Sequence, residues 1–232
     1  MRIALQPAYI LHSRPYRDSS AILELFTAEH GRFGVVARGA RRQTRRGGRN
    51  GLLQPFTPLL VSCSGRGELK TLGAVEPAGG PWQLVGDRMF SGMYLNELLM
   101  RMLHRYDPHP TLFAAYGEAL GALALPGSPD AVLRGFELGL LQDLGYNLVL
   151  DIDGDSGAPV TGGDSYRYLP GVGLVSAAGG YPGADLLQMA RGEFTGQARR
   201  TAKLLLREAL SEHLGDEPLR SRELFRARRT GQ

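Results

Sequence analysis

The sequence contains very little cysteine, and this scarcity excludes several kinds of structure. Cys63 is the single cysteine in 232 residues. One thiol can form neither an intramolecular disulfide nor a zinc site built from several cysteines. Residues 1–30 lack the basic stretch and apolar core of a secretory signal, and no uncharged run reaches the ~20 residues of a membrane helix. We therefore expect a cytoplasmic protein that needs no metal or other cofactor.

The sequence also lacks the motifs of known catalytic and metal-binding sites, although it contains residue types that occur in them. The five histidines are scattered, and none has the spacing of a zinc protease. Asp151, Asp153 and Asp155 alternate as in a calcium loop, but no glutamate follows at the twelfth position, which favours a turn. Cys63 lies in a predicted strand and is interpreted as a core thiol. These features predict a protein that is not an enzyme.

The charge is distributed unevenly along the chain. Residues 1–78 contain 12 Lys and Arg against 5 Asp and Glu, a net charge of +7. The remaining residues contain 15 against 18, a net charge of −3. A polyanionic partner is therefore expected at the N-terminal third.

The first 78 residues have the pattern of a small β domain. Short segments rich in β-branched, aromatic and leucine side chains alternate with Gly, Pro, Ser and Asp. The expected strands are residues 8–12, 20–27, 32–38, 52–63 and 68–75. Five strands in so short a stretch predict a closed barrel, and the oligonucleotide-binding (OB) fold is the five-stranded form.

Residues 79–86 interrupt this pattern, and helical periodicity follows. Apolar side chains then recur every three to four residues. The expected helices are residues 87–106, 111–125, 129–144, 184–191, 195–214 and 221–228. Residues 146–182 are rich in glycine and lose the helical period, with short strands expected at 166–169 and 173–175. The fold class is therefore α+β, with an OB-fold domain at 1–78 and a helical domain at 79–232 that contains an insert at about 146–182.

The strongest local feature is an arginine-rich segment between the third and fourth expected strands. Residues 38–51 contain six arginines, four glycines and no acid. A glycine-rich backbone allows several guanidinium groups to converge on a phosphate chain, and the affinity should fall steeply with salt. A solvated basic loop is the alternative, but its position on a barrel favours nucleic-acid binding. The arginines of this segment are Arg38, Arg41, Arg42, Arg45, Arg46 and Arg49.

Further basic and aromatic residues of the barrel could extend this interface. Arg14, Arg17 and Arg32 are candidates for the same groove, and Arg66 and Lys70 for its opposite rim. Tyr16 lies among polar residues in an expected turn and is the aromatic side chain most suited to stacking on a base. The other aromatic side chains occupy alternating strand positions typical of core residues. They are Tyr9, Phe26, Phe33 and Phe56.

The helical domain offers a second kind of site. Arg134 begins an apolar helix face, and Arg199, Arg200 and Lys203 border another. An apolar groove with a basic rim would suit an acidic peptide that ends in an aromatic residue and a carboxylate. The alternative is that these are ordinary long side chains beside a core.

Several short segments that are spread over nearly the whole chain form a specific combination. They are residues 11–20 (LHSRPYRDSS), 36–41 (VARGAR), 53–60 (LQPFTPLL), 65–72 (GRGELKTL), 94–99 (YLNELL), 134–138 (RGFEL) with 144–146 (LGY), and 221–226 (SRELFR). In this order along the chain, they together resemble the bacterial RecO family of DNA repair proteins. The resemblance implies an N-terminal OB-fold, a helical C-terminal domain and a small zinc-ribbon-like insert. Many family members have four cysteines in that insert, whereas residues 146–182 have none. We therefore expect no zinc.

The resemblance also implies a function. Such a protein would be associated with the nucleoid, bind single- and double-stranded DNA and anneal complementary strands. With RecR it would help to load RecA onto DNA coated by single-stranded-DNA-binding protein (SSB). Family members bind the acidic SSB tail through the helical domain, and Arg134 and Arg200 match that role. An RNA-binding OB module, or a DNA-modifying enzyme, is the alternative.

Overall fold

The computed structural model describes residues 2–41, 51–146 and 148–224. Their contacts divide the chain into two compact units. The first unit extends to Leu125 and also includes the segment that begins at Leu219. The second unit is Pro126–Pro218. The expected boundary near residue 78 therefore lies inside the first unit, because two helices pack onto the barrel.

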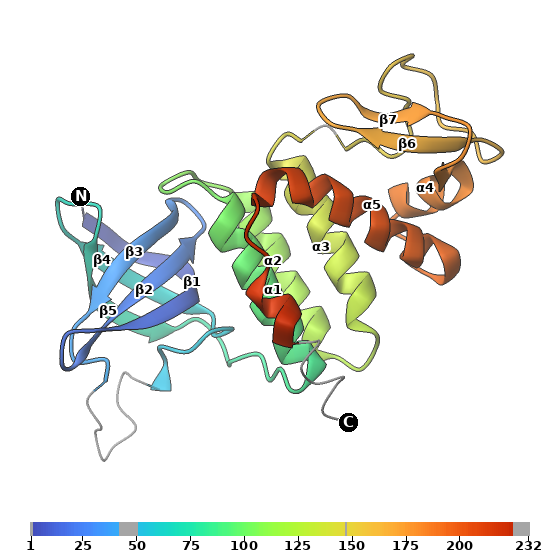
Figure 1. Cartoon of the computed structure of the whole chain (residues 1–232). Coiled ribbons are helices and arrows are strands. Elements are labelled where there is room, and N and C mark those ends of the chain that lie inside the picture. The colour runs from blue at the N-terminus through green and yellow to red at the C-terminus, as the bar shows by residue number, and fades with distance from the viewer. Residues whose placement is uncertain (1, 42–50, 147, 225–232) are drawn as a thin grey trace. The chain divides into compact units, whose positions relative to one another are not determined.

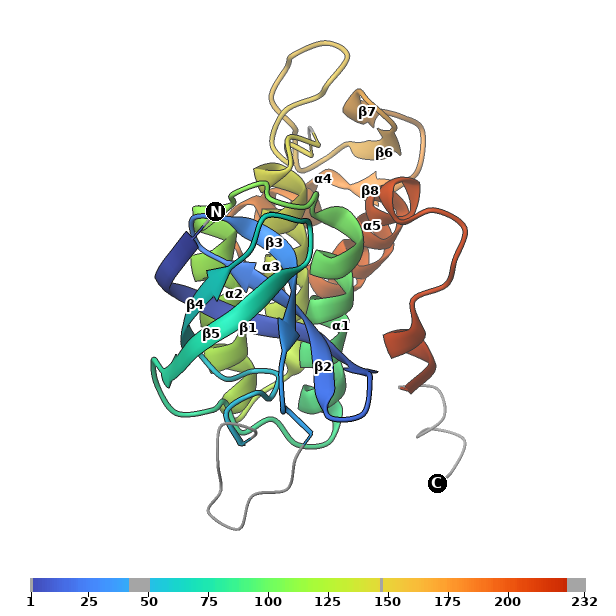
Figure 2. The same cartoon turned by 90° about the vertical axis from the view of Figure 1, so that its left-hand side faces the viewer.

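The first unit contains the closed five-stranded barrel that the sequence predicts (Figures 1 and 2). Its strands are β1 (Arg2–Tyr16), β2 (Ser20–Thr27), β3 (Gly31–Ala37), β4 (Leu59–Ser64) and β5 (Lys70–Pro77). Neighbours follow the order β1-β2-β3-β5-β4, and β1 also pairs with β4. The β3–β5 pair is parallel and the other pairs are antiparallel. The expectation of an OB-type barrel is confirmed.

Alternating side chains fill the interior of the barrel. On β2, Leu23 and Leu25 point inward and are at most 1% exposed, and on β3 the same is true of Phe33 and Val35. The period of two places these apolar side chains on one face of each strand. Cys63 belongs to the same core cluster, as expected for a buried thiol.

The outer face of the β1–β2 pair is buried as well, because α1 (Asp87–Met102) packs on β1 and α2 (Pro110–Ala124) packs on β2. The ring centroids of Phe26 and Phe113 lie 5.4 Å apart, and those of Tyr9 and Tyr116 lie 5.0 Å apart. The side-chain amide of Asn96 donates a hydrogen bond to the carbonyl of Leu11 at 2.9 Å. We call this surface of β1 and β2 the helix-covered face.

Helix α1 ends four residues before the expected end at residue 106. The chain instead turns to run beside β3, where the amide of Tyr106 donates to the carbonyl of Arg32 at 2.9 Å. The Tyr106 ring stacks on Phe33, with centroids 5.4 Å apart and planes 8° apart. Strand β4 is also shorter than expected, because Pro55 and Pro58 cannot donate to a ladder and Phe56 has a φ of 63°.

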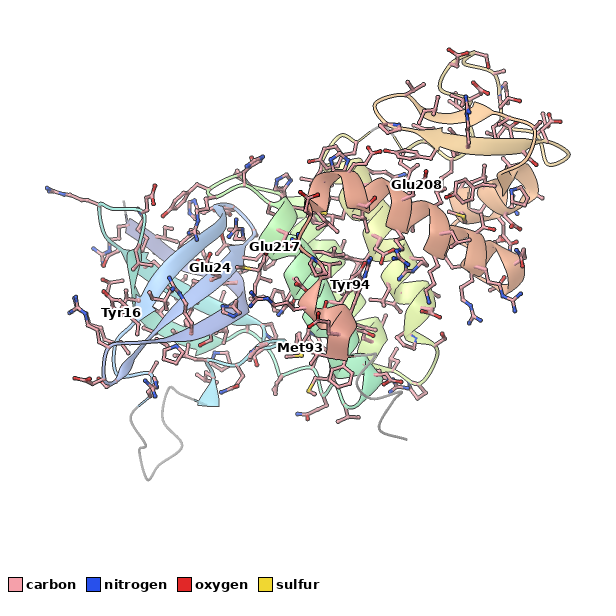
Figure 3. All side chains as sticks on the ribbon, viewed as in Figure 1. Tyr16, Glu24, Met93, Tyr94, Glu208 and Glu217 are labelled. Atoms are coloured by element: carbon pink, nitrogen blue, oxygen red, sulfur yellow. The ribbon has the colours of Figure 1, made fainter. Side chains whose placement is uncertain are left out.

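The C-terminal part of the first unit is held against α1 by a carboxylate. The chain is helical at 220–224. The Glu97 carboxylate accepts hydrogen bonds from the amides of Arg220 and Ser221, each at 2.9 Å. The Arg222 guanidinium lies 5.8 Å from the centroid of the Tyr94 ring on α1 (Figure 3). Glu97 thus satisfies amides at the start of this helix that have no partner within the helix itself.

The second unit is built on three helices, α3 (Pro129–Asp143), α4 (Gly183–Ala190) and α5 (Gly196–Leu214). Pro129 is the first helical residue and Ser128 precedes it, as expected, although the Ser128 side chain makes no capping hydrogen bond. Small and apolar side chains that recur every three or four residues on α5 are buried against α3 and α4. They include Ala198, Ala202, Leu205 and Ala209.

The insert contains a three-stranded sheet with the order β7-β6-β8, made of β6 (Ser165–Leu169), β7 (Gly173–Ser176) and β8 (Tyr181–Pro182). One carboxylate links its parts. Asp153 accepts hydrogen bonds from the amides of Asp155 and Ser156 through Oδ1, and from the amide of Ser176 through Oδ2. These backbone hydrogen bonds, with that from Ser156 the largest, lower the pKa of Asp153. The expected turn at 151–155 is therefore confirmed, but this carboxylate is buried rather than solvated.

Tyrosine side chains join the insert to α5. The Tyr181 hydroxyl donates to Glu208 at 2.5 Å, and the Tyr168 hydroxyl donates to Glu212 at 3.5 Å. Burial, together with these carboxylates, raises the pKa of both hydroxyls. The acids of α5 therefore face the insert.

Candidate nucleic-acid interface

The strands of the barrel bring several polar side chains together at one end. Tyr16, the last residue of β1, pairs with Ser20, the first residue of β2. At the same end Ala21 pairs with Ala37, and Val36 pairs with Thr71. Figure 3 shows Tyr16 at this end of the barrel, away from α1. The register of four strands therefore fixes which side chains meet here.

These strand ends surround an open groove of about 600 Å³, which we call the loop-end groove. Its lining residues are Tyr16, Arg17, Ser19, Ser20, Val36, Arg38, Gly39 and Thr71. Two guanidinium groups, a phenol ring and three aliphatic hydroxyls thus share one cavity. Guanidinium groups and hydroxyls bind phosphate and sugar, and an aromatic ring can stack on a base.

The two arginines of the loop-end groove are exposed. Among the described residues neither Arg17 nor Arg38 forms an ion pair with a carboxylate. The guanidinium of Arg17 lies 5.1 Å from the centroid of the Tyr16 ring. Arg17 also has a φ of 51°, in the left-handed region that disfavours residues with a side chain. Strained residues of this kind concentrate at ligand sites.

Other predicted DNA-binding residues lie around the barrel. Arg14 and Arg66 are exposed, on β1 and in the β4–β5 connection. Arg41 is exposed, and its amide donates to the carbonyl of Ser19 at 3.0 Å, so the arginine-rich segment begins beside the loop-end groove. The remaining arginines of that segment lie outside the described residues. They are Arg42, Arg45, Arg46 and Arg49.

The structure corrects the role expected for Arg32. Its Nε and Nη2 donate to the carbonyl of Leu103 at 3.2 and 2.9 Å, and its Nη1 pairs with Glu24 at 3.3 Å. Arg105 completes the cluster with a 2.6 Å contact to the other oxygen of Glu24. Burial lowers the pKa of Arg32, while Glu24 opposes that change. This guanidinium joins the barrel to the end of α1, and we leave it out of the interface.

The expected place of Lys70 on the rim of the groove is corrected as well, because its ammonium has partners within the protein. It is 6% exposed, and its ammonium donates to the carbonyl of Gly67 at 2.6 Å. The ammonium also lies 5.2 Å from the centroid of the Tyr106 ring. A cation with two partners inside the protein contributes little to a phosphate contact.

The second unit has a smaller pocket of about 310 Å³ between α3 and the end of α4, which we call the α3–α4 pocket. It is lined mainly by apolar groups and glycines, with Gln142 and Asp151 as polar members. Its apolar side chains are Leu138, Val149, Leu150, Met189, Ala190 and Phe194. A pocket of this size and lining suits an aromatic side chain.

The basic residues predicted around such a pocket have different environments. Arg134 is 7% exposed and pairs at 2.7 Å with Glu137, which is fully buried, so it is not part of a solvent-facing rim as expected. Arg200 and Lys203 are exposed on α5, and Arg199 is half-buried. The basic side chain missed by the sequence analysis is Arg191, which is exposed and lies between the pocket residues Ala190 and Gly192.

Comparison with known families divides the chain directly after the barrel, so that α1 and α2 fall in the second part. Residues 1–81 match the model of the N-terminal part of recombination protein O, and residues 83–223 match the model of its C-terminal part. The chain belongs to the RecO family.

Curated RecO proteins cover almost the whole chain. A DNA repair protein RecO from Methylococcus capsulatus is 46% identical over 97% of this chain and 94% of its own length. Proteins with the same name from Alkalilimnicola ehrlichii and Nitrosospira multiformis are 47% and 43% identical, over 97% and 95% of this chain and 92% and 94% of their own lengths. The resemblance seen in the sequence motifs is therefore confirmed.

Two further findings concern the described residues of this RecO-family chain. None of its described helices is long and apolar enough to cross a membrane. No group of three or more His, Cys, Asp or Glu side chains in the described ranges could hold a metal ion.

Sequence patterns did not indicate that Ser19, Ser20 and Thr71 line the loop-end groove, because only the strand register brings β5 beside the β1–β2 hairpin.

Proposed function

We propose that this RecO-family protein is a non-enzymatic DNA repair and recombination mediator that binds DNA at the loop end of its barrel. The observation that carries this proposal is the loop-end groove. It places Arg17 and Arg38, neither in an ion pair within the described chain, beside Tyr16 and at the start of the arginine-rich segment. Contacts of this kind are made to the DNA backbone and carry little sequence preference.

Annealing of complementary strands follows from the same charge. Two DNA strands repel each other through their phosphates, and a basic protein surface screens that repulsion. No bond is made or broken, so the activity needs no nucleophile or general base. Membership of the RecO family supports the further proposal that the protein works with RecR to load RecA onto SSB-coated single strands.

The arginine-rich segment can be tested through the salt dependence of binding. We expect that replacing Arg41, Arg42, Arg45 and Arg46 with Ala weakens binding to single- and double-stranded DNA. The slope of log affinity against log salt should flatten by about 0.7–0.9 for each phosphate that the variant no longer neutralises. A control variant removes four exposed arginines outside the barrel, Arg167, Arg191, Arg207 and Arg220. An unchanged slope in the first variant would refute the assignment.

The alternatives can be separated with the wild-type chain. We expect tighter binding to single-stranded DNA than to RNA of equal sequence, and a preference for RNA would favour an RNA-binding module. Labelled DNA incubated with Mg²⁺ or Mn²⁺ should remain intact. Metal-dependent cleavage would instead identify a nuclease.

We further propose that the α3–α4 pocket and exposed basic residues of the second unit bind the acidic C-terminal tail of SSB. The pocket would take the terminal aromatic side chain, while Arg191, Arg200 and Lys203 would attract the carboxylates. Charge complementarity of this kind speeds association and sets orientation.

Gly139 allows the pocket to be blocked without harm to the fold. A Cβ at this position would have no atom of its surroundings within 4 Å, and glycine is unfavourable inside a helix. Gly139→Leu should fill the pocket and lower the affinity for a fluorescent acidic peptide with a C-terminal Phe by at least about tenfold. Arg200→Ala should lower it less, and Arg167→Ala should leave it unchanged. Normal binding by Gly139→Leu would remove the pocket from the proposal.

A further inference from the structure

The aromatic side chains of the barrel differ sharply in their availability. Five lie in residues 2–78, all of them described, and four are buried. Tyr9 and Phe26 pack against α2, and Phe33 stacks on Tyr106. Phe56 lies against α1, where a Cβ on Gly92 would come within 2.8 Å of its ring. Tyr16 alone is not buried, and it lines the loop-end groove.

Only part of the usual ligand surface of an OB barrel is available here. OB-folds commonly bind oligonucleotides on the face of strands 2 and 3 and on the loops beside it. In this protein α2 packs on the outer side of β2, and the Glu24 carboxylate there forms ion pairs with Arg32 and Arg105. A base that stacks on an aromatic side chain of this barrel has to do so at its end, on Tyr16.

We propose that the loop-end groove is a subsite for one unpaired nucleotide of a DNA strand, with its base on Tyr16 and its phosphates against Arg17 and Arg38. This inference rests on the proposed DNA-binding function and specifies the structure that the DNA must have. The volume of about 600 Å³ accommodates a nucleotide. A base paired within a duplex is covered on both faces by its neighbours, so only an unpaired base can stack on the ring.

The geometry of the groove favours such a complex. Tyr16 is fixed by its pairing with Ser20, and the Arg17 guanidinium lies over its ring, which limits the entropy lost on binding. Ser19, Ser20 and Thr71 supply hydroxyls that can donate to or accept from a sugar or any base edge. The subsite therefore selects for an unpaired nucleotide without selecting the base.

The test uses the full chain with a single-stranded oligonucleotide and a blunt duplex of the same sequence. Tyr16→Ala should weaken single-strand binding by about 5- to 100-fold, which is the effect of losing one base–aromatic stack. Binding to the duplex should stay within about twofold. Tyr16→Phe keeps the ring and should bind both as the wild type does. Arg66→Ala, which removes an exposed charge of the barrel, should weaken the binding of both ligands equally.

A base analogue provides an independent measurement. The fluorescence of 2-aminopurine in the single strand should be quenched by the wild type and by Tyr16→Phe, and not by Tyr16→Ala. If the wild type binds neither ligand, the proposed function and the subsite both fail. Suppose instead that the wild type binds both ligands. If Tyr16→Ala then has the wild-type affinity for both, or loses affinity for both equally, only the subsite is overturned.

Discussion

Arg32 and Arg38 lie six residues apart, on β3 and just after it, and their environments are opposite. Arg32 is on the outside of the barrel beside α1, where Glu24 and the carbonyl of Leu103 take up its donors. Arg38 lies at the loop end, exposed and without an ion pair in the described parts of the chain. The same residue type therefore stabilises the fold at one site and remains available for a ligand at the other.

The aromatic side chains repeat this contrast. Phe26 is fully buried between β2 and α2, whereas Tyr16 faces the loop-end groove. We therefore expect the helix-covered face to contribute stability and the loop end to contribute binding. Substitutions at the two sites should accordingly change different measured quantities.

The largest effect is expected for Phe26→Ala. Truncation of this buried ring leaves a cavity against Phe113 and Tyr116 and should cost about 3–5 kcal/mol in the free energy of unfolding. Urea denaturation measures this loss. The affinity of the remaining folded protein for single-stranded DNA should be unchanged, and a parallel loss of affinity per folded molecule would break the comparison.

Glu24→Ala should have the next largest effect. It leaves the half-buried guanidinium of Arg32 without its carboxylate, which should cost about 2–3 kcal/mol in the free energy of unfolding. Glu76→Ala removes an exposed carboxylate from β5 and serves as the control, with a change within about 0.5 kcal/mol. If the two variants unfold at the same urea concentration, Glu24 does not hold the helix-covered face.

Lys70 and Arg66 provide a third contrast, because they are close in sequence and differ in burial. Lys70→Ala should lower the free energy of unfolding by about 1–2 kcal/mol, since its ammonium bonds to Gly67 and lies over Tyr106. It should leave the salt slope of DNA binding unchanged. Arg66→Ala should leave stability unchanged and flatten that slope, and the reverse pattern would contradict the assignment.

The smallest change in stability is expected for Arg17→Gly. Glycine relieves the left-handed backbone at this position, and this relief offsets the removal of the cation–π interaction between the guanidinium and Tyr16. The free energy of unfolding should stay within about 0.5 kcal/mol of the wild type, while DNA binding weakens. A variant that binds DNA normally would show that Arg17 has no role in binding.

Sequence patterns were sufficient where local chemistry decides the structure. A short apolar segment between turn residues predicted the bounds of β2 at Ser20 and Thr27, and the proline at 129 marked the start of α3. The motifs indicated the family. The composition of residues 38–51 indicated a polyanion partner, which the experiments above test.

Sequence patterns failed where the partner of a side chain is distant along the chain. Arg32 and Lys70 are basic residues in a basic domain, and their partners Leu103 and Tyr106 belong to the segment after α1. The burial of Arg134 beside Glu137 depends on how α3 packs in its unit. No periodicity within a single element reports such contacts.

The central claim is that DNA binds at the loop end of the barrel and not on its helix-covered face. Amide chemical shifts of the isotope-labelled protein, followed by NMR during titration with a short single-stranded oligonucleotide, test it most directly. We predict the largest shift changes at residues 16–20 and 36–39 and small changes at 22–26. Large changes at 22–26 and on α2, with residues 16–20 unaffected, would contradict it.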